Sequence, residues 1–352
     1  MKYLRKPKHM PLWQVIVLDA LLVGITLLVY AFFHHVLPKW IAEYELQQFL
    51  AQQTELVYET TQQTEPPVTD TTEPSDSVPV ETTEPDLRTE WQKKFADKFT
   101  DEVVITDNSY TSPEVSVTIE TVVEKVDGRQ VTYYVADVYV ASLDNFKTYT
   151  AYDQMRYYIA QDAEKMAVAC NAIYGISGDY FSAQKNGFLV RNGQVYVNDR
   201  NNNICVLFPD GTMETYDRAT YKVEDIMARD PVQVWSFGPV LLDPDGTVRD
   251  RYEVSDAISY ANPRSAVGYY EPGHYLLVTV DGRQNHSYGL SIPQLAQVFA
   301  DRGCKVAYNL DGGATAVATF GGEVISKQSN YRELSDMLII TESGYTTHRK
   351  GH

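Results

Sequence analysis

The sequence predicts an α+β fold: a β-rich mixed sheet flanked by a few helices, preceded by one transmembrane helix and a disordered stalk. Three observations support this prediction. Short runs in which apolar and polar residues alternate are separated by Asp-Gly or Asn-Gly pairs, a pattern typical of β-hairpins. One amphipathic stretch with helix signals at both ends lies between two apolar runs. A long apolar segment near the N-terminus is followed by a Thr-, Glu- and Pro-rich segment.

The N-terminal segment predicts a membrane anchor. Residues 1–11 are basic and are expected to form a cytoplasmic tail. Residues 12–37 are mostly apolar and exceed the roughly 20 residues that a transmembrane helix needs. No small-residue cleavage site follows, so the run predicts an uncleaved signal anchor. Asp19 lies inside it and either has a polar partner in the membrane or lies near the cytoplasmic surface; both interpretations stay open.

Residues 38–87 predict a juxtamembrane segment and a disordered stalk. Thr-Thr-Glu-Pro occurs at 71–74 and again at 82–85, and such a composition buries too little apolar surface to offset the entropy of ordering. Residues 88–345 follow as an extracytoplasmic domain, with a short tail at 346–352. This organisation predicts a single-pass protein of a bacterial cell membrane, of the Gram-positive type, with its domain outside the cell.

The composition limits the class of function. A net charge of −17 argues against nucleic-acid binding, which needs basic patches. Three cysteines allow at most one internal disulfide, so the sequence does not predict a disulfide-stapled domain. No spacing of His and Cys residues indicates a zinc site.

The domain begins with predicted strands. Residues 115–119 alternate as a half-buried strand should, and Asp127-Gly128 separates them from a second strand run at 131–140. Further hairpins are predicted around Asn192-Gly193 and Asp210-Gly211.

Two helices are predicted in the domain. One covers residues 152–164. The other covers residues 291–303, with Ser at its N-cap, Pro in its first turn and Gly at its end. Strands predicted at 275–280 and 306–310 flank the second helix, so these elements form a β–α–β unit in which a parallel strand pair is expected.

The end of the 306–310 strand is the first candidate for a functional site. The apolar run stops at Asp311-Gly312-Gly313, which places a carboxylate and accessible backbone N–H groups at the tip of a strand. An ordinary Asp-Gly turn has the same local sequence. Three other stretches also place an acid or an arginine beside glycine near a strand end: Gly178-Asp179-Tyr180-Phe181, Asn262-Pro263-Arg264 with Gly268, and Asp281-Gly282-Arg283.

Taken in order, these stretches resemble the phosphodiester glycosidase family, in its bacterial exopolysaccharide-associated branch, over about residues 171–341. Phe237-Gly238-Pro239 and Gly289-Leu290-Ser291 belong to the same pattern. The animal member of this family is the uncovering enzyme of the mannose-6-phosphate pathway, which removes N-acetylglucosamine from a phosphodiester. The resemblance implies a glycoside hydrolase that cleaves a sugar-1-phosphodiester linkage in envelope or exported polysaccharide.

The chain departs from the family pattern in two places. Ser177-Gly178-Asp179 stands where the family usually has Asn-Gly-Gly before the aromatic pair. Ala314-Thr315-Ala316 stands where Gly-Ser-Ser or Gly-Ser-Thr usually follows Asp-Gly-Gly. Thr315 still supplies a hydroxyl, so these departures bear on the identity of the substrate more than on the class of reaction.

The chemistry of this reaction assigns roles to the residues. An oxocarbenium-like transition state needs a carboxylate that stabilises or attacks it, and Asp311 is the first candidate, followed by Asp281. Guanidinium groups match phosphate oxygens. The predicted substrate- and phosphate-binding residues are Arg264, Arg283, Asp179, Asn309, Gly312, Gly313, Thr315 and Arg332.

Several alternatives stay open. Asp281-Gly282 is also a standard turn, Arg283 is also explained as a solvated charge, and Arg332 as a structural ion pair. His274 and His286 are interpreted as loop residues. No cofactor is evidently required and no metal site is assigned, although Ca²⁺ would suit a convergence of acids that includes Asp179.

Two other functions also fit the sequence. A non-catalytic surface module that binds glycan or phosphopolymer during exopolysaccharide assembly would use the same glycines and arginines. A glycosyltransferase would pass the sugar to an acceptor instead of to water. In every case we expect a carbohydrate phosphodiester as the partner, with the membrane engaged only through the N-terminal helix.

Overall fold

The structure, a computed structural model, describes residues 12–37, 86, 88–181, 187–198, 202–218, 220–327 and 329–342. The chain divides into two compact units, Met1–Val80 and Glu81–His352. The predicted tails at 1–11 and 346–352 and nearly all of the predicted stalk lie outside the described residues.

Among the described residues of the first unit, the helix α1 (Leu12–Ala31) continues into a π-helical turn at Phe32–Val36. Among the residues that the structure describes, no helix combines the length and the apolar character required to cross a membrane. The membrane span expected at residues 12–37 therefore stays a prediction.

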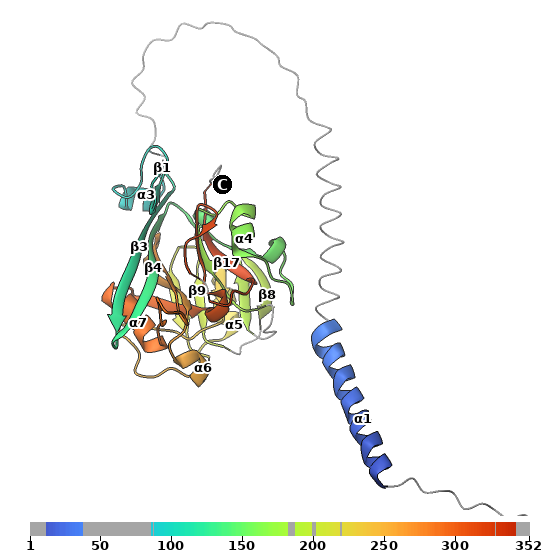
Figure 1. The fold of residues 1–352 in the computed structure, drawn as a ribbon. Helices are drawn as coiled ribbons and strands as arrows, with labels where there is room; N and C mark the ends of the chain where they lie inside the picture. The colour runs from blue at the N-terminus through green and yellow to red at the C-terminus, as the bar shows by residue number, and fades with distance from the viewer. Residues whose placement is uncertain are drawn as a thin grey trace, which may run out of the picture. The chain divides into compact units, whose positions relative to one another are not determined.

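The second unit is β-rich with a few short helices, as the sequence predicts. Its largest sheet has seven strands in the order β1-β2-β3-β4-β13-β12-β14, and the long β3–β4 hairpin is prominent in Figure 1. The strands are β1 (Val104–Ile105), β2 (Ser109–Thr111), β3 (Val115–Val126), β4 (Arg129–Val140), β12 (Arg264–Glu271), β13 (His274–Val280) and β14 (Val306–Leu310).

Two five-stranded sheets complete the unit. One has the order β10-β9-β11-β7-β8 and the other β16-β15-β6-β17-β5. The first is built from β7 (Phe188–Arg191), β8 (Gln194–Asn198), β9 (Ile204–Leu207), β10 (Met213–Tyr216) and β11 (Gln233–Trp235). The second is built from β5 (Phe146–Thr150), β6 (Tyr174–Ser177), β15 (Ala318–Phe320), β16 (Glu323–Val324) and β17 (Asp336–Ile340).

The predicted hairpins are confirmed. Asp127 and Gly128 join β3 to β4 with φ of 50° and 78°, and Asn192 and Gly193 join β7 to β8 with φ of 51° and 81°. Two consecutive left-handed residues match the right-handed twist of the strands that they connect. The Asp210-Gly211 pair likewise lies between β9 and β10.

The expected parallel strand pair is absent, and the predicted mixed sheet is replaced by three sheets in the described part of the chain. All the strand pairs that the structure describes are antiparallel, and β12 lies between β13 and β14, paired with both. Arg264 is opposite Val280, and Ser265 is opposite Leu310. The helix between β13 and β14 therefore carries the chain past an intervening strand. As a consequence, the start of β12 and the ends of β13 and β14 meet at one edge, which we call the site edge.

The helix predicted at 291–303 is confirmed as α7 (Ile292–Asp301). The Ser291 side chain accepts the backbone N–H of Gln294, and proline occupies the first turn. Leu295 and Phe299 are fully buried and pack with residues of β12 and β13 in one hydrophobic cluster. This burial, more than helix propensity, holds α7 on the sheet.

The helix predicted at 152–164 is wrong. A 3₁₀ turn covers Ala151–Asp153, and the helix α4 begins only at Ala163 and ends at Ala169. Tyr152, Asp153 and Tyr158 have positive φ, so a right-handed helix cannot pass through them. The remaining helical segments are α3 (Glu90–Lys94), η2 (Leu143–Asn145), α5 (Val223–Met227), α6 (Asp256–Ser259) and η4 (Gly313–Thr315).

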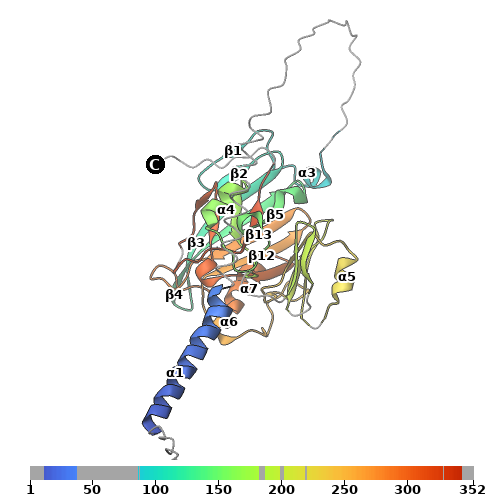
Figure 2. The same cartoon turned by 90° about the vertical axis from the view of Figure 1, so that its right-hand side faces the viewer.

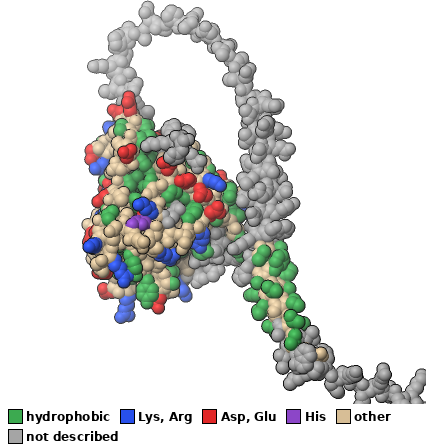
Figure 3. Space-filling model, viewed as in Figure 1, with side chains coloured by type: hydrophobic (Ala, Val, Ile, Leu, Met, Phe, Trp, Pro, Cys, Tyr) green, Lys and Arg blue, Asp and Glu red, His purple; other side chains and the backbone are tan. Residues whose placement is uncertain are grey.

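The main core lies between the three sheets, where Tyr275 and Tyr308 of the large sheet pack in one cluster with Trp235 of β11 and Leu338 of β17. Figure 2 shows these layers from a second direction. Cys170, Cys205 and Cys304 are free thiols, and burial raises the pKa of each. On the face in view in Figure 3, acidic and basic side chains of the domain are interspersed.

Candidate active site

The four stretches singled out in the sequence converge at the site edge. Arg264 is the first residue of β12, Asp281 follows β13, and Asp311 follows β14. The backbone N–H of Asp311 donates to the carbonyl of Gly178, 2.8 Å away, which ties the end of β14 to the end of β6. Segments far apart in the sequence are thus held together by backbone contacts.

The glycines at this edge are required by close backbone approach. A Cβ at Gly312 would lie 2.7 Å from the carbonyl oxygen of Pro263, and one at Gly282 would lie 2.6 Å from the Pro263 nitrogen. Gly313 has φ of +65°, and its N–H donates to the same Pro263 oxygen at 2.8 Å. The two acid-bearing turns therefore close on either side of Pro263, and no side chain fits between them.

Asp311 is a buried carboxyl group with one charged partner. Its residue is 6% exposed, and Arg332 donates from Nη2 to Oδ2 at 3.0 Å. Burial raises the pKa of Asp311 to about 7, because desolvation outweighs the lowering effects of Arg332 and of the nearby Thr315 hydroxyl, while the negative Asp179 and Asp336 raise it further. The carboxyl group can therefore exchange its proton near neutral pH.

The partners of Asp311 are themselves held in place. The guanidinium of Arg332 lies 4.1 Å from the ring centre of Tyr180, and its backbone N–H donates to Ala314 at 2.9 Å. Thr315 Oγ1 donates to the Gly312 carbonyl at 2.8 Å. The predicted residues Asp311, Gly312, Thr315 and Arg332 thus form one connected group.

Asp281 forms a second group on the other side of β12. It is 2% exposed, and its carboxylate accepts the Lys327 backbone N–H at 2.9 Å and contacts His286 Nε2 at 3.0 Å. The Tyr134 hydroxyl donates to it over 3.4 Å. Burial raises the pKa of Asp281, although the hydrogen bond from His286 opposes the shift.

The two carboxyl groups belong to separate clusters. Asp281 and Asp311 follow strands on either side of β12, so their main chains are about 10 Å apart at the usual strand spacing. No hydrogen bond between described residues joins the two carboxylates. The arrangement differs from a dyad of acids that share one proton.

Of the three predicted arginines, Arg264 and Arg283 differ in their exposure to solvent. Arg283 is exposed, its Nε and Nη2 donate to Asn262 Oδ1 at 3.1 and 2.7 Å, and its Nη2 lies 3.4 Å from the position of a Cβ at Gly313. Arg264 is buried and donates to the carbonyls of Leu290, Ile258 and Tyr260. Burial and the nearby Arg283 lower the pKa of Arg264 to about 10. Arg264 therefore holds the backbone around the site in place through these carbonyls, whereas the side chain of Arg283 is exposed to solvent.

Asp179 is satisfied by internal partners. Its carboxylate accepts Arg191 Nη2 at 2.8 Å and the backbone N–H groups of Ser236 and Phe237 at 2.9 and 3.0 Å. Arg191 also donates to Asp336 at 2.7 Å, and Asp336 accepts the Asp179 N–H at 2.6 Å. This buried network holds the Gly178–Asp179 turn against which Asp311 is fixed.

Sequence reasoning did not single out Arg191 or Asp336, and it interpreted His286 as a loop residue. The available signals were two charged residues in apolar strands, Arg191 at the end of β7 and Asp336 at the start of β17. An isolated charge in a buried strand needs a partner. His286 carried no local signal. Asn309, which sequence reasoning did select, donates from Nδ2 to Gly238 at 2.7 Å and is buried.

The acids do not gather into a metal-binding cluster in the part of the chain that the structure describes. Over those ranges, no group of three or more His, Cys, Asp or Glu side chains could hold a metal ion. Asp179, Asp281 and Asp311 each have different partners.

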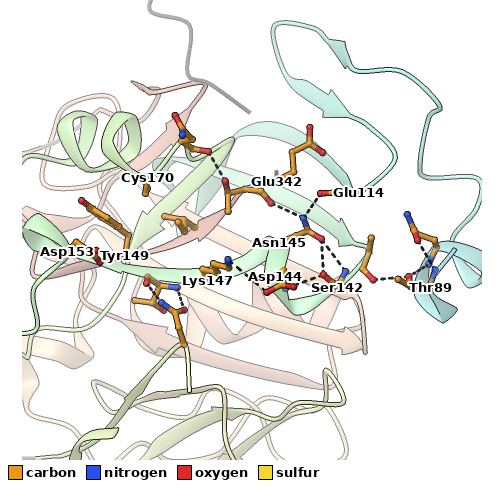
Figure 4. Close-up of a pocket in the computed structure, with 17 residues that line it drawn as sticks. Thr89, Glu114, Ser142, Asp144, Asn145, Lys147, Tyr149, Asp153, Cys170 and Glu342 are labelled. Carbon is orange, nitrogen blue, oxygen red and sulfur yellow. Dashed lines mark hydrogen bonds and ion pairs between the residues drawn. The ribbon is translucent and has the colours of Figure 1, made fainter. Parts of the chain in front are cut away.

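A cavity of about 750 Å³ lies away from the site edge. Figure 4 shows Lys147, Tyr149, Asn145 and Glu342 among the side chains around it. Glu342 lies beyond the carboxyl end of β17. Asp336, which contacts Asp179, is the first residue of the same strand. The two ends of the strand are separated by roughly 15 Å. None of the predicted site residues lines this cavity, and its Asn145 amide is occupied by Glu114 and the Thr341 carbonyl.

Comparison with known proteins finds similarity over the region of the chain that contains these residues. The phosphodiester glycosidase family model matches residues 170–341. An uncharacterized SPβ prophage-derived protein of Bacillus subtilis, YomE, is 29% identical over 140 residues, which are 39% of this chain and 22% of that protein. The chain thus spans about a fifth of the length of this curated relative.

A solved structure shares the fold. The catalytic domain of zebrafish N-acetylglucosamine-1-phosphodiester alpha-N-acetylglucosaminidase, auto-inhibited by its pro-peptide, aligns with a TM-score of 0.54 at 21% identity, over 68% of this chain and 88% of that chain. A hypothetical protein from Synechocystis aligns with a TM-score of 0.46 at 14% identity, over 65% of this chain and 62% of that chain.

Proposed function

Residues 170–341 match the phosphodiester glycosidase family, and from this premise we propose that the chain is an enzyme that hydrolyses the bond between a sugar and a phosphodiester. The observation that supports this most is Asp311, a buried carboxyl group of raised pKa at a strand end, beside Gly312-Gly313 and an outward-facing Arg283. The acid, Asp311, and the cation, Arg283, are adjacent. A substrate in which a sugar is joined to a phosphate requires both, the acid for the sugar and the cation for the phosphate.

Asp311 acts on the sugar. As the bond from the anomeric carbon to the phosphate oxygen breaks, positive charge develops on the sugar ring, and the Asp311 carboxylate stabilises or attacks that carbon. Arg332, 3.0 Å from Oδ2, favours the ionised form that this role needs. This ion pair therefore offsets part of the cost of ionising a buried carboxyl group.

Arg283 acts on the phosphate. The phosphate takes the bonding electron pair as it leaves, and a guanidinium stabilises the resulting negative charge. The Cβ-free surface of Gly313 leaves room for a phosphate oxygen beside Nη2. The buried charge of Arg264 has no carboxylate partner among its described contacts and adds to the positive potential there.

Asp281 and His286 complete the hydrolysis. Water supplies the oxygen that finally bonds to the anomeric carbon, and a base must take its proton. His286 Nε2 lies 3.0 Å from Asp281, so the buried carboxylate orients the imidazole and stabilises it once protonated. We assign this pair to proton transfer, in place of a direct attack by Asp281.

The test is release of free sugar by the full chain from an α-linked sugar-1-phosphodiester. Asp311→Asn is expected to lower kcat about 100- to 1,000-fold, the size of the loss of a key electrostatic group. Asp144→Asn serves as the control, because the side chain of Asp144 is 93% exposed. If neither the wild type nor the control releases sugar while all three proteins bind the glycan, the chain is a binding module. A sugar–acceptor product in place of free sugar identifies a transferase.

We propose further that the substrate is envelope or exported polysaccharide and that the enzyme is tethered to the outer face of a membrane. The support is the basic segment 1–11, the apolar segment 12–37 and the Thr/Glu/Pro-rich composition that follows.

A further inference from the structure

A second hollow lies next to the site edge and is not used by the reaction as derived above. It is a groove of about 380 Å³, within the range of small-ligand sites. Tyr260 and Tyr288 line it, together with the polar side chains of Arg129, Asp127 and Gln294.

The two tyrosines are unusually exposed for large aromatic residues. Tyr260 is 66% exposed and Tyr288 is 47% exposed, although burial of an aromatic ring is normally a large gain. The Tyr288 ring is also held in place, because the guanidinium of Arg129 lies 3.9 Å from its centre. An ordered ring left in solvent offers a flat surface on which another ring can stack.

Both walls of the groove are anchored on the residues that would hold the phosphate. The backbone N–H of Arg283 donates to the Tyr288 carbonyl at 3.3 Å. Asn262, which accepts the Arg283 side chain, donates from Nδ2 to the Tyr260 carbonyl at 3.0 Å. The groove therefore lies directly beside Arg283.

We propose that this groove binds the sugar unit that leaves with the phosphate, stacked on Tyr288 and Tyr260, while the sugar that is cut off lies on the Asp311 side of Arg283. This inference rests on the proposed function. Val126 is the one branched aliphatic side chain in the groove lining, so a lipid alcohol would find little apolar surface. At the edges, Gln294 Nε2 donates to Asp127 Oδ2 at 2.7 Å, which leaves the second Asp127 oxygen and the N–H groups of Arg129 for hydrogen bonds with sugar hydroxyls.

The test compares two substrates on the full chain, a hexose-1-phosphate methyl diester and the same hexose-1-phosphate esterified to a second hexose. Tyr288→Ala is expected to raise KM for the disaccharide substrate about 2- to 10-fold, the size of one aromatic contact, and to leave the methyl diester unchanged. Tyr288→Phe keeps the ring and should keep the wild-type KM. Val123→Ala is the control, since Val123 is 60% exposed on β3.

Binding measured by calorimetry separates this inference from the proposed function. If the wild type hydrolyses both substrates with equal KM and Tyr288→Ala changes neither, the groove is not a leaving-group site. A nucleoside diester bound more tightly than the disaccharide would likewise overturn the choice of a sugar. If nothing is hydrolysed, yet the disaccharide binds more tightly than the methyl diester and Tyr288→Ala removes the difference, the groove stands and the proposed hydrolysis fails.

Discussion

Asp311 shows how a single residue trades stability for function. Its folded-state pKa of about 7 lies above the ordinary value of 3.8. Protonated Asp311 therefore favours the folded state below the ordinary pKa, and this contribution is lost as the pH rises through about 7. Each unit of such a shift corresponds to about 1.4 kcal/mol. Above pH 7 the folded protein is therefore less stable than it would be without an ionised carboxyl group buried at the strand end.

The pH dependence of the reaction follows from the same residue. Because Asp311 must be ionised, kcat/KM of the wild type should rise with pH and level off above about 7. Arg332 lowers the pKa of Asp311, so Arg332→Ala should move the rise to higher pH. The measurement is the pH profile of kcat/KM, with Arg251→Ala as an exposed control. A profile that falls through pH 7 in the wild type would instead identify Asp311 as the general acid.

At the scale of elements, local chemistry was predictable from the sequence and long-range order was not. The Asp127-Gly128 and Asn192-Gly193 turns and the capped helix α7 follow from residues next to one another. The position of β12 between β13 and β14 depends on contacts between distant segments, so the expectation of a parallel pair failed. The prediction of a helix at 152–164 failed because the pattern of apolar residues does not reveal which residues have positive φ, as Tyr158 does.

The same distinction applies to the site. The positions of Asp281, Arg283 and Asp311 just after strand ends were predictable, because each residue stands beside the glycine that its turn requires. Arg191 and Asp336 become meaningful only when β7 and β17 are brought together, since neither has a charged partner nearby in sequence. His286 becomes a candidate only through its contact with Asp281.

A glycine substitution tests the packing of these elements. Gly312→Ala places a methyl group 2.7 Å from the Pro263 carbonyl, so β14 and the start of β12 must separate. We expect a loss of about 1–3 kcal/mol in the free energy of unfolding and a fall in kcat/KM. Gly128→Ala is the matched control: its φ of +78° also costs stability, but a Cβ there meets nothing within 4 Å. Equal loss of activity in both variants, measured at matched folded fractions, would refute the packing argument.

At the scale of the whole molecule, the second unit contains all three sheets and every predicted site residue. A chain of residues 81–352 should therefore unfold cooperatively on its own and match the kcat/KM of the full chain on small substrates. Cell fractionation tests the proposed tether: the full chain should sediment with membranes and the 81–352 chain should not. If the full chain stays in the supernatant, the tether is wrong while the proposed chemistry is unaffected.

The three free cysteines have a consequence for how the protein matures. Cys170, Cys205 and Cys304 form no covalent links, and burial raises the pKa of each thiol, so little reactive thiolate is present at neutral pH. Reaching the compact state therefore requires no oxidant, disulfide isomerase or particular redox potential. The stability of the domain should therefore be the same in the reducing interior of a cell as in the oxidising medium around it.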